Sequence, residues 1–255
     1  MILMLGDIHS NFAYLKYVIK SRKLTNCTII QVGDFGIGFL PKKDNEILLD
    51  LNDFLKEWSV VVYAIRGNHD DPSYFQGNHI FENIKLLPDY SILELEGHKI
   101  LLVGGATSVD RKGRLSKMQL SASVGVSQPE YWFDESFVLD EEKLKSIKGI
   151  DTVVTHTAPE WCCPDNRNGF GDFVLNFAEY DEYLLEDLKS ERDLLTKMFH
   201  ILKDNGNHIK QHFYGHFHRE ALTINGMCSH YLLSINQVMQ LDTTTEEDYE
   251  KLFNE

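Results

Sequence analysis

Short apolar runs and amphipathic segments alternate along the first part of the chain. Residues 1–5, 28–34 and 60–70 each contain a continuous apolar run, which is typical of strands that are buried on both faces. Between these runs, residues 10–23 and 45–58 repeat apolar side chains every three or four positions, which predicts helices with one buried face. Asn11 or Ser10 is expected to cap the first helix. The order strand–helix–strand–helix–strand predicts a parallel sheet with helices packed against it.

The pattern changes after residue 90. Residues 106–138 and 157–177 lack periodicity, so we expect two irregular loop regions near the functional site. The acidic tail, residues 243–255, is expected to form a frayed surface helix. The other segments predict a hairpin turning at Glu96-Gly97, a short helix over 140–149, a strand over 151–159, a long helix over 178–205, a strand and turn over 211–218, and a hairpin turning at Asn225-Gly226.

Composition narrows the class of protein. With 255 residues, 43% hydrophobic and 25% charged, the chain is an ordinary globular protein of one large or two small domains. Its formal net charge of −14 disfavours non-specific nucleic-acid binding, although bound divalent cations could still attract a phosphate substrate. The four cysteines are too few and scattered for a disulfide scaffold, and neither a basic leader nor a membrane-length apolar run is found. We therefore expect a cytoplasmic protein without a membrane partner.

Residues suited to metal binding follow the predicted strands. They are Asp7 and His9 in "GDIH", Asp34 in "GDFG", Asn68 and His69 in "GNHD", His156 in "VTH", and His216 and His218 in "GHFH". Because the carboxyl ends of parallel strands open on one edge of a sheet, these side chains can converge there. Imidazoles, carboxylates and one amide suit Mn, Fe or Zn, and eight groups are too many for one ion. Two ions about 3.5–4 Å apart, sharing one carboxylate, would use them.

Each motif also has a simpler interpretation. A lone "GD" after a strand is common turn chemistry, and a lone pair of histidines is often a packing or surface pair. The six histidines outside the motifs are expected to have such roles. Four glycines favour the metal interpretation, because each precedes a ligand-type residue and lets the backbone crowd around a small ion: Gly6, Gly33, Gly67 and Gly215.

Together, "GDIH", "GDFG", "GNHD", "TH" and "GHFH" resemble the motif set of the calcineurin-like metallophosphoesterase family, over residues 7–218. The resemblance implies a single domain over residues 1–255, built as an α/β fold: a four-layer α/β/β/α sandwich of two mixed sheets flanked by helices. It implies that one metal ion is held by Asp7, His9, Asp34 and His218, and a second by Asp34, Asn68, His156 and His216. Asp34 would bridge the two ions, of which Mn is expected to support activity best.

The activity that the resemblance implies is hydrolysis of a phosphomonoester or phosphodiester by a metal-bridging hydroxide. His69 would donate a proton to the leaving group. Asp70 would either orient that imidazole or cap the turn before Pro72. Arg111, within residues 106–138, is a candidate for binding the substrate phosphate, and Arg114 is a weaker one; both could instead be solvated loop arginines.

Several functions share such a centre. The substrate could be a phosphorylated small molecule, a nucleotide or a phosphoprotein, so a nucleotide pyrophosphohydrolase or a protein phosphatase are alternatives. "GDFG" lacks the Asp-Arg that follows in serine/threonine phosphatases, which disfavours that narrower assignment. A non-catalytic scaffold or protein-binding module on the same fold is the alternative from another class, and the complete motif set argues against it.

Overall fold

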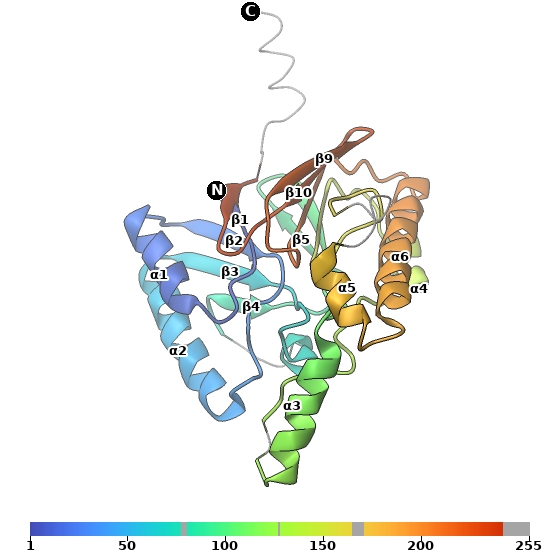
Figure 1. Ribbon diagram of the computed structural model, residues 1–255. Helices are drawn as coiled ribbons and strands as arrows, with labels where there is room; N and C mark the ends of the chain where they lie inside the picture. Colours follow the sequence, from blue (N-terminus) through green and yellow to red (C-terminus); the bar gives the residue numbers. More distant parts are fainter. Residues whose placement is uncertain (78–80, 127, 165–170, 242–255) are drawn as a thin grey trace, which may run out of the picture.

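Two β-sheets pack face to face, and helices cover the outer face of each (Figure 1). The computed structural model describes residues 1–77, 81–126, 128–164 and 171–241. The fold is therefore the predicted four-layer α/β/β/α sandwich of two mixed sheets. The predicted acidic tail over 243–255 lies outside the described residues.

The first sheet has the strand order β11-β1-β2-β3-β4. Strands β1 (Ile2–Leu5), β2 (Cys27–Gln31), β3 (Val60–Ala64) and β4 (Ile84–Leu86) are parallel, and β11 (Val238–Gln240) pairs antiparallel with β1. Helices α1 (Phe12–Ser21) and α2 (Pro41–Glu57) cover its outer face. In β1, Leu3 and Leu5 pack with these helices, whereas Ile2 and Met4 face the second sheet. Burial on both faces explains why this strand is a continuous apolar run.

The second sheet has the order β5-β6-β7-β8-β10-β9. Strands β6 (His98–Val103), β7 (Thr152–Thr155), β8 (Gln211–Tyr214) and β10 (Cys228–Leu232) are parallel, while β5 (Ser91–Leu95) and β9 (Ala221–Asn225) pair antiparallel at the edges. Both predicted hairpins are confirmed. Helices α4 (Glu141–Ser146) and α6 (Leu184–Asp204) pack on the outer face through a cluster that contains Leu144, Leu195 and Leu202.

The irregular region predicted over 106–138 is wrong in part, because it contains helix α3 (Arg111–Ser123). Arg114 is the only buried residue of this helix, so the sequence carries no apolar stripe that would indicate it. Helix α3 projects away from the rest of the fold in Figure 1. The second irregular region, 157–177, likewise contains most of helix α5 (Asp172–Ala178), none of whose residues is buried.

Smaller differences concern element ends. Helix α6 begins at Leu184 rather than residue 178, and α2 begins at Pro41, where a proline is compatible with a first helical turn. Strands β4 and β11, three residues each, were too short to be predicted from periodicity. Among the described residues, no helix is both long and apolar enough to cross a membrane.

Candidate metal centre

The seven residues predicted as metal ligands come together where strands of both sheets end. Asp7 and His9 follow β1, Asp34 follows β2 and Asn68 follows β3, all in the first sheet. The second sheet supplies His156 after β7, and His216 and His218 after β8. The centre therefore lies across the two sheets. Its ligand-type residues are far apart in the chain: His9 and His218, for example, are separated by 209 positions.

One group consists of Asp7, His9, Asp34 and His218, each of which offers a ligand atom within 4.8 Å of the others. The Nε2 atoms of His9 and His218 are 3.0 Å apart. Nε2 of His218 lies 3.3 Å from Oδ2 of Asp7, and Nε2 of His9 lies 3.6 Å from Oδ2 of Asp34. These are the four residues assigned to the first ion.

A second group surrounds the other oxygen of Asp34. Nε2 of His156 lies 3.2 Å from Oδ1 of Asp34 and 3.1 Å from Oδ1 of Asn68. The same Asn68 oxygen is 2.9 Å from Nδ1 of His216. Nδ1 of His156 faces the carbonyl oxygen of Val32 at 2.9 Å, which can only accept, so the proton of a neutral ring sits on Nδ1. Nε2 then presents its lone pair to the centre, as a metal-binding histidine requires.

The protonation of His156 and the ionisation of Asp34 depend on each other. Burial opposes ionisation of both partners, but the adjacent Asp34 carboxylate raises the pKa of His156 to about 9. In the same way, burial alone would raise the pKa of Asp34, yet His156 and the neighbouring histidines hold that pKa well below its usual range. A cation in the centre would replace the proton on His156 as the partner of this carboxylate.

Two carboxylate oxygens support the fit of a metal ion. Among the described residues, Oδ1 of Asp7 and Oδ2 of Asp34 are buried without a hydrogen-bond partner. A buried carboxylate oxygen that lacks a partner costs free energy, and a divalent cation is a partner that the surrounding imidazoles can share. The residues present therefore fit the metal ions that the sequence predicts.

Glycines and left-handed backbone bring these side chains close. A Cβ on Gly67 would lie 2.1 Å from Oδ1 of Asp34, and one on Gly215 would lie 2.0 Å from Oδ1 of Asp7, so neither position can hold a larger residue without a shift. His9, Asp34, His216 and His218 have φ angles of 45°, 57°, 70° and 52°. Such conformations are uncommon outside glycine and cluster at functional sites.

His69 lies beside the ligands without joining either group. Its backbone N–H donates to Oδ1 of Asp34 at 2.7 Å, and its ring lines the cavity next to the centre. Burial lowers the pKa of this imidazole to about 4.

Asp70 serves the backbone of the neighbouring loop. Its carboxylate accepts hydrogen bonds from the N–H groups of Phe35, Gly36, Ile37 and Gly67. No hydrogen bond joins it to the His69 ring, and the cap before Pro72 comes from Asp71, whose Oδ1 accepts from Ser73 N–H at 2.9 Å. A catalytic role for Asp70 stays a prediction.

Arg111 is engaged away from the ligand groups. Its guanidinium pairs with Asp181 and, at 2.7 Å, with Asp187, and it is not among the residues that line the cavity. Binding of phosphate by Arg111 would require it to leave these ion pairs, so this role also stays a prediction.

Arg114 lies closer to the centre than Arg111 does. It donates to the carbonyl oxygen of Asn68 at 3.1 Å and to Oγ of Ser108. Ser108 in turn accepts from Nδ2 of Asn68 at 2.9 Å and donates to Glu135 at 2.8 Å. This buried network orients the amide of Asn68, and sequence reasoning missed both Ser108 and Glu135 because they lie in the aperiodic region.

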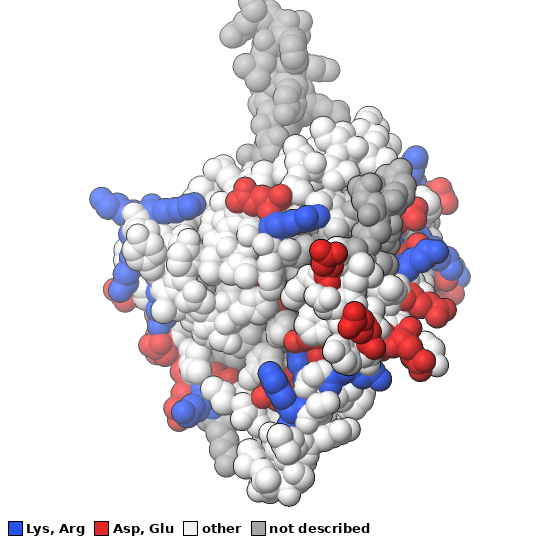
Figure 2. Space-filling view, in the orientation of Figure 1, with Lys and Arg blue, Asp and Glu red and all other residues white. Residues whose placement is uncertain are grey.

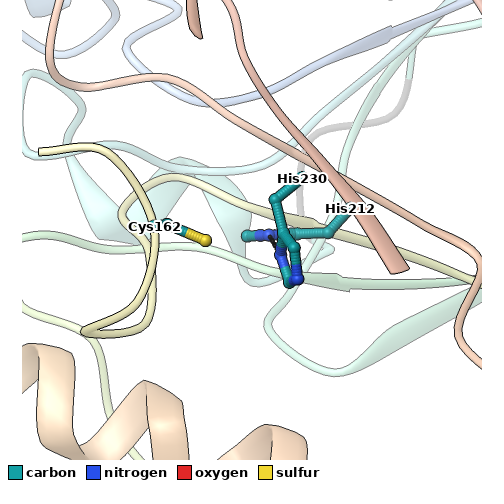
Figure 3. A group of neighbouring side chains, drawn as sticks. All are labelled: Cys162, His212 and His230. Carbon is teal, nitrogen blue, oxygen red and sulfur yellow. Dashed lines mark hydrogen bonds between the residues drawn. The ribbon is translucent and has the colours of Figure 1, made fainter. Parts of the chain in front are cut away.

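A second cluster of ligand-type residues, Cys162, His212 and His230, lies in the second sheet and an adjacent loop (Figure 3). Trp161 Nε1 donates to Nε2 of His230 at 3.3 Å, so a neutral His230 carries its proton on Nδ1, 2.9 Å from Nδ1 of His212. Nε2 of His212 then donates to Oγ1 of Thr155 at 2.7 Å, and this hydroxyl donates to the carbonyl oxygen of Thr157. The two histidines thus satisfy each other's hydrogen-bonding groups without an ion. The chain of hydrogen bonds ends at Thr155 and Thr157, the residues directly before and after His156.

The candidate centre opens into a cavity of about 460 Å³. Asp34, Asn68, His69, His216 and His218 form one end of its lining. Basic and acidic side chains are interspersed on the face drawn in Figure 2, without a continuous basic stripe among the residues coloured there.

The family model described as calcineurin-like phosphoesterase matches residues 1–220, so the chain belongs to this family. None of the curated proteins matches the chain. Among solved structures, a putative 5'-nucleotidase from Staphylococcus aureus is 15% identical, with a TM-score of 0.46, over 94% of this chain and 51% of that one. GAP50, the anchor in the inner membrane complex of Plasmodium, is 14% identical, with a TM-score of 0.43, over 91% and 70%. The phosphopantetheinyl hydrolase PptH from Mycobacterium tuberculosis is 12% identical, with a TM-score of 0.46, over 92% and 89%.

Proposed function

We propose that this protein is a phosphoesterase that uses two divalent metal ions, with Mn as the ion that best supports activity, to hydrolyse a phosphomonoester or phosphodiester. The observation that carries the proposal is the convergence of two ligand groups on separate oxygens of Asp34: His9 near Oδ2 and His156 near Oδ1. One ion would be held by Asp7, His9, Asp34 and His218, and the other by Asp34, Asn68, His156 and His216. Bound there, the ions would supply an acidified water and neutralise charge on the phosphoryl oxygens.

His69 is proposed as the group that protonates the leaving oxygen. Its ring lines the same cavity as the ligands, so it lies within the space that the ester must enter. Burial keeps this ring neutral at neutral pH in the free protein, with a pKa of about 4. A bound phosphate dianion favours the protonated ring and raises that pKa, so substrate binding itself would promote protonation of His69.

The wall of the cavity supports a small organic substrate. Phosphorylated small molecules, including nucleotides, are compact enough for a cavity of about 460 Å³.

The decisive experiment reconstitutes chelator-treated protein with Mn²⁺, Fe²⁺ or Zn²⁺. Bound metal is counted by elemental analysis, and turnover is followed with 4-nitrophenyl phosphate and bis(4-nitrophenyl) phosphate. We expect about two ions per chain and turnover that depends on them.

Asp34→Asn tests the shared carboxylate, because it keeps the shape of the side chain and removes the charge. This variant is expected to lose two-ion occupancy and turnover together. Asp50→Asn is the matched control, since Asp50 is an exposed carboxylate paired with Lys16. Two ions retained by Asp34→Asn would contradict the bridging role, and absence of turnover with either ester and every metal would favour a non-catalytic module.

A further inference from the structure

The cavity beside the candidate metal centre is lined by both polar and apolar side chains. Four of the ligand-type residues and His69 belong to its polar lining, together with Asp110, Arg192 and Arg219. The apolar part of the lining, here called the apolar subsite, is formed by Val109, Pro164, Phe173, Val174, Phe177, Leu188 and Phe217. Both parts line one cavity, so a molecule whose phosphate sits at the ligands has this apolar surface within the same space.

Helix α5 supplies the most exposed part of the apolar subsite. Phe173, Val174 and Phe177 are spaced so that they share one face of the helix, and this face lines the cavity. The rings of Phe173 and Phe177 meet edge to face, with centroids 5.2 Å apart. Phe173 is 66% exposed, although transfer of such a ring from water to an apolar contact is favourable. Phe177 is half-buried, and an aromatic pair with one exposed ring that lines a cavity is typical of a surface that a ligand covers.

Other parts of the cavity lining are held in place by hydrogen bonds. Arg192 donates to the carbonyl oxygens of Pro159 at 2.9 Å and Cys162 at 2.7 Å, and its guanidinium lies 5.5 Å from the centre of the Phe217 ring. Arg219 donates to Sγ of Cys163. These contacts fix the loop that carries the wall, and a preformed wall lowers the entropic cost of binding an apolar group.

We propose that the apolar subsite binds the organic portion of the substrate, and that this portion is an aromatic or alkyl group of about six carbons or more. The inference rests on the proposed function for the position of the phosphate. It narrows the substrate class from phosphate esters in general to esters of apolar alcohols or phenols. Small, highly hydroxylated phosphate esters would leave the aromatic wall in contact with water and are therefore poor substrates.

The test is a series of 4-alkylphenyl phosphates with methyl, butyl and hexyl chains. The leaving phenols have nearly equal acidity, so the chemical step is matched and differences in kcat/KM report contacts of the chain. We expect kcat/KM to rise on the order of tenfold or more from methyl to hexyl, because each buried methylene contributes several-fold. An equal kcat/KM along the series would overturn the proposal.

Variants locate the effect. Phe173→Ser and Phe177→Ser are expected to remove most of the dependence on chain length, because each takes an aromatic ring out of the wall. Phe133→Ser is the matched control: Phe133 is 78% exposed and does not line the cavity, so this variant should keep the wild-type dependence. Wild-type chain-length dependence in both α5 variants would show that the chains bind elsewhere.

A measurement without turnover separates this inference from the proposed function. Methylphosphonate and hexylphosphonate are titrated calorimetrically into the Mn²⁺-loaded protein. Tighter binding of hexylphosphonate, on the order of tenfold, that is lost in Phe177→Ser supports the apolar subsite even if no ester is hydrolysed. Turnover of esters combined with equal binding of the two phosphonates would support the enzyme and overturn the subsite.

Discussion

At the scale of single residues, His69 differs from the histidines around it in having no place in either ligand group. We expect His69→Asn to retain its metal content and to lose turnover by about 10²–10⁴-fold, the usual contribution of a general acid. The loss should be larger for phenyl phosphate than for 4-nitrophenyl phosphate, because 4-nitrophenolate leaves without much help from a proton. Steady-state kinetics and elemental analysis of the variant check this. Loss of metal would make His69 a ligand, and equal losses with both esters would exclude a proton donor.

Gly67 is a second residue that its neighbours constrain, because they leave no room for a side chain at this position. Because an added Cβ would meet Oδ1 of Asp34 at 2.1 Å, Gly67→Ala must displace that carboxylate or the backbone beside it. We expect its affinity for Mn²⁺ to fall by tenfold or more, about 1.4 kcal/mol, in a competition titration with a fluorescent chelator. Gly113→Ala is the control: outside the backbone of its own helix no atom lies within 4 Å of its added Cβ, and it is in the first turn of α3, where alanine is compatible with the helix. Equal metal affinity of both variants would contradict this account.

At the scale of elements, the sequence predicted those parts whose burial leaves a periodic pattern. Strands such as β1, and helix α1 with its Asn11 cap, are visible because each has a face or a run in the core. The positions of the ligand-type residues were also predictable, because a strand end followed by glycine and a polar residue repeats along the chain. That these residues hold metal ions stays a prediction.

Elements without a buried face were not predictable. Helix α3 buries only Arg114, and α5 buries no residue, so neither has an apolar stripe that a periodicity can detect. The contacts of Arg114 with Ser108 and Asn68 depend on how the region around α3 folds back onto the centre. Such contacts between distant segments are a property of the tertiary structure and have no local signal.

Strands β8 and β10 carry two buried histidines, His212 and His230, from which we predict a pH dependence of stability. Burial lowers the pKa of His230 from 6.5 to about 4, and burial together with the neighbouring His230 lowers that of His212 as well. A base with a lowered folded pKa binds its proton more readily in the unfolded chain. Stability is therefore fully present above pH 6.5 and is lost as the pH falls toward 4, by about 3 kcal/mol for His230.

Urea unfolding of the metal-free protein between pH 7 and pH 4 measures this effect. His230→Gln removes one titrating group, so its free energy of unfolding should fall less steeply with acid than that of the wild type. His208→Gln changes an exposed histidine and is expected to keep the wild-type slope. If His230→Gln and the wild type have parallel profiles, the buried pair does not contribute to acid sensitivity.

At the scale of the whole molecule, the candidate centre joins the two sheets. Asp7, Asp34 and Asn68 come from the first sheet, and His156 and His216 come from the second. The apolar cluster between the sheets, which includes Ile30, Val154 and Phe213, holds the same two layers together away from the centre. At this edge one carboxylate oxygen of Asp7 and one of Asp34 are buried without a hydrogen-bond partner, which costs free energy, and cations bound there would remove that cost by binding residues from both sheets.

Metal removal is accordingly expected to lower the thermal stability of the entire fold. An ion present at about 100 times its dissociation constant stabilises the folded state by about 2.7 kcal/mol. For a chain of this length that corresponds to a melting temperature about 5–10 °C higher with Mn²⁺ than after chelation. Calorimetric melts with and without chelator measure the difference. It should persist in His69→Asn, which keeps all ligands, and shrink in Asp34→Asn, where the shared carboxylate is lost. Equal melting temperatures of metal-loaded and metal-free wild type, with occupancy verified by elemental analysis, would mean that the ions do not link the two sheets.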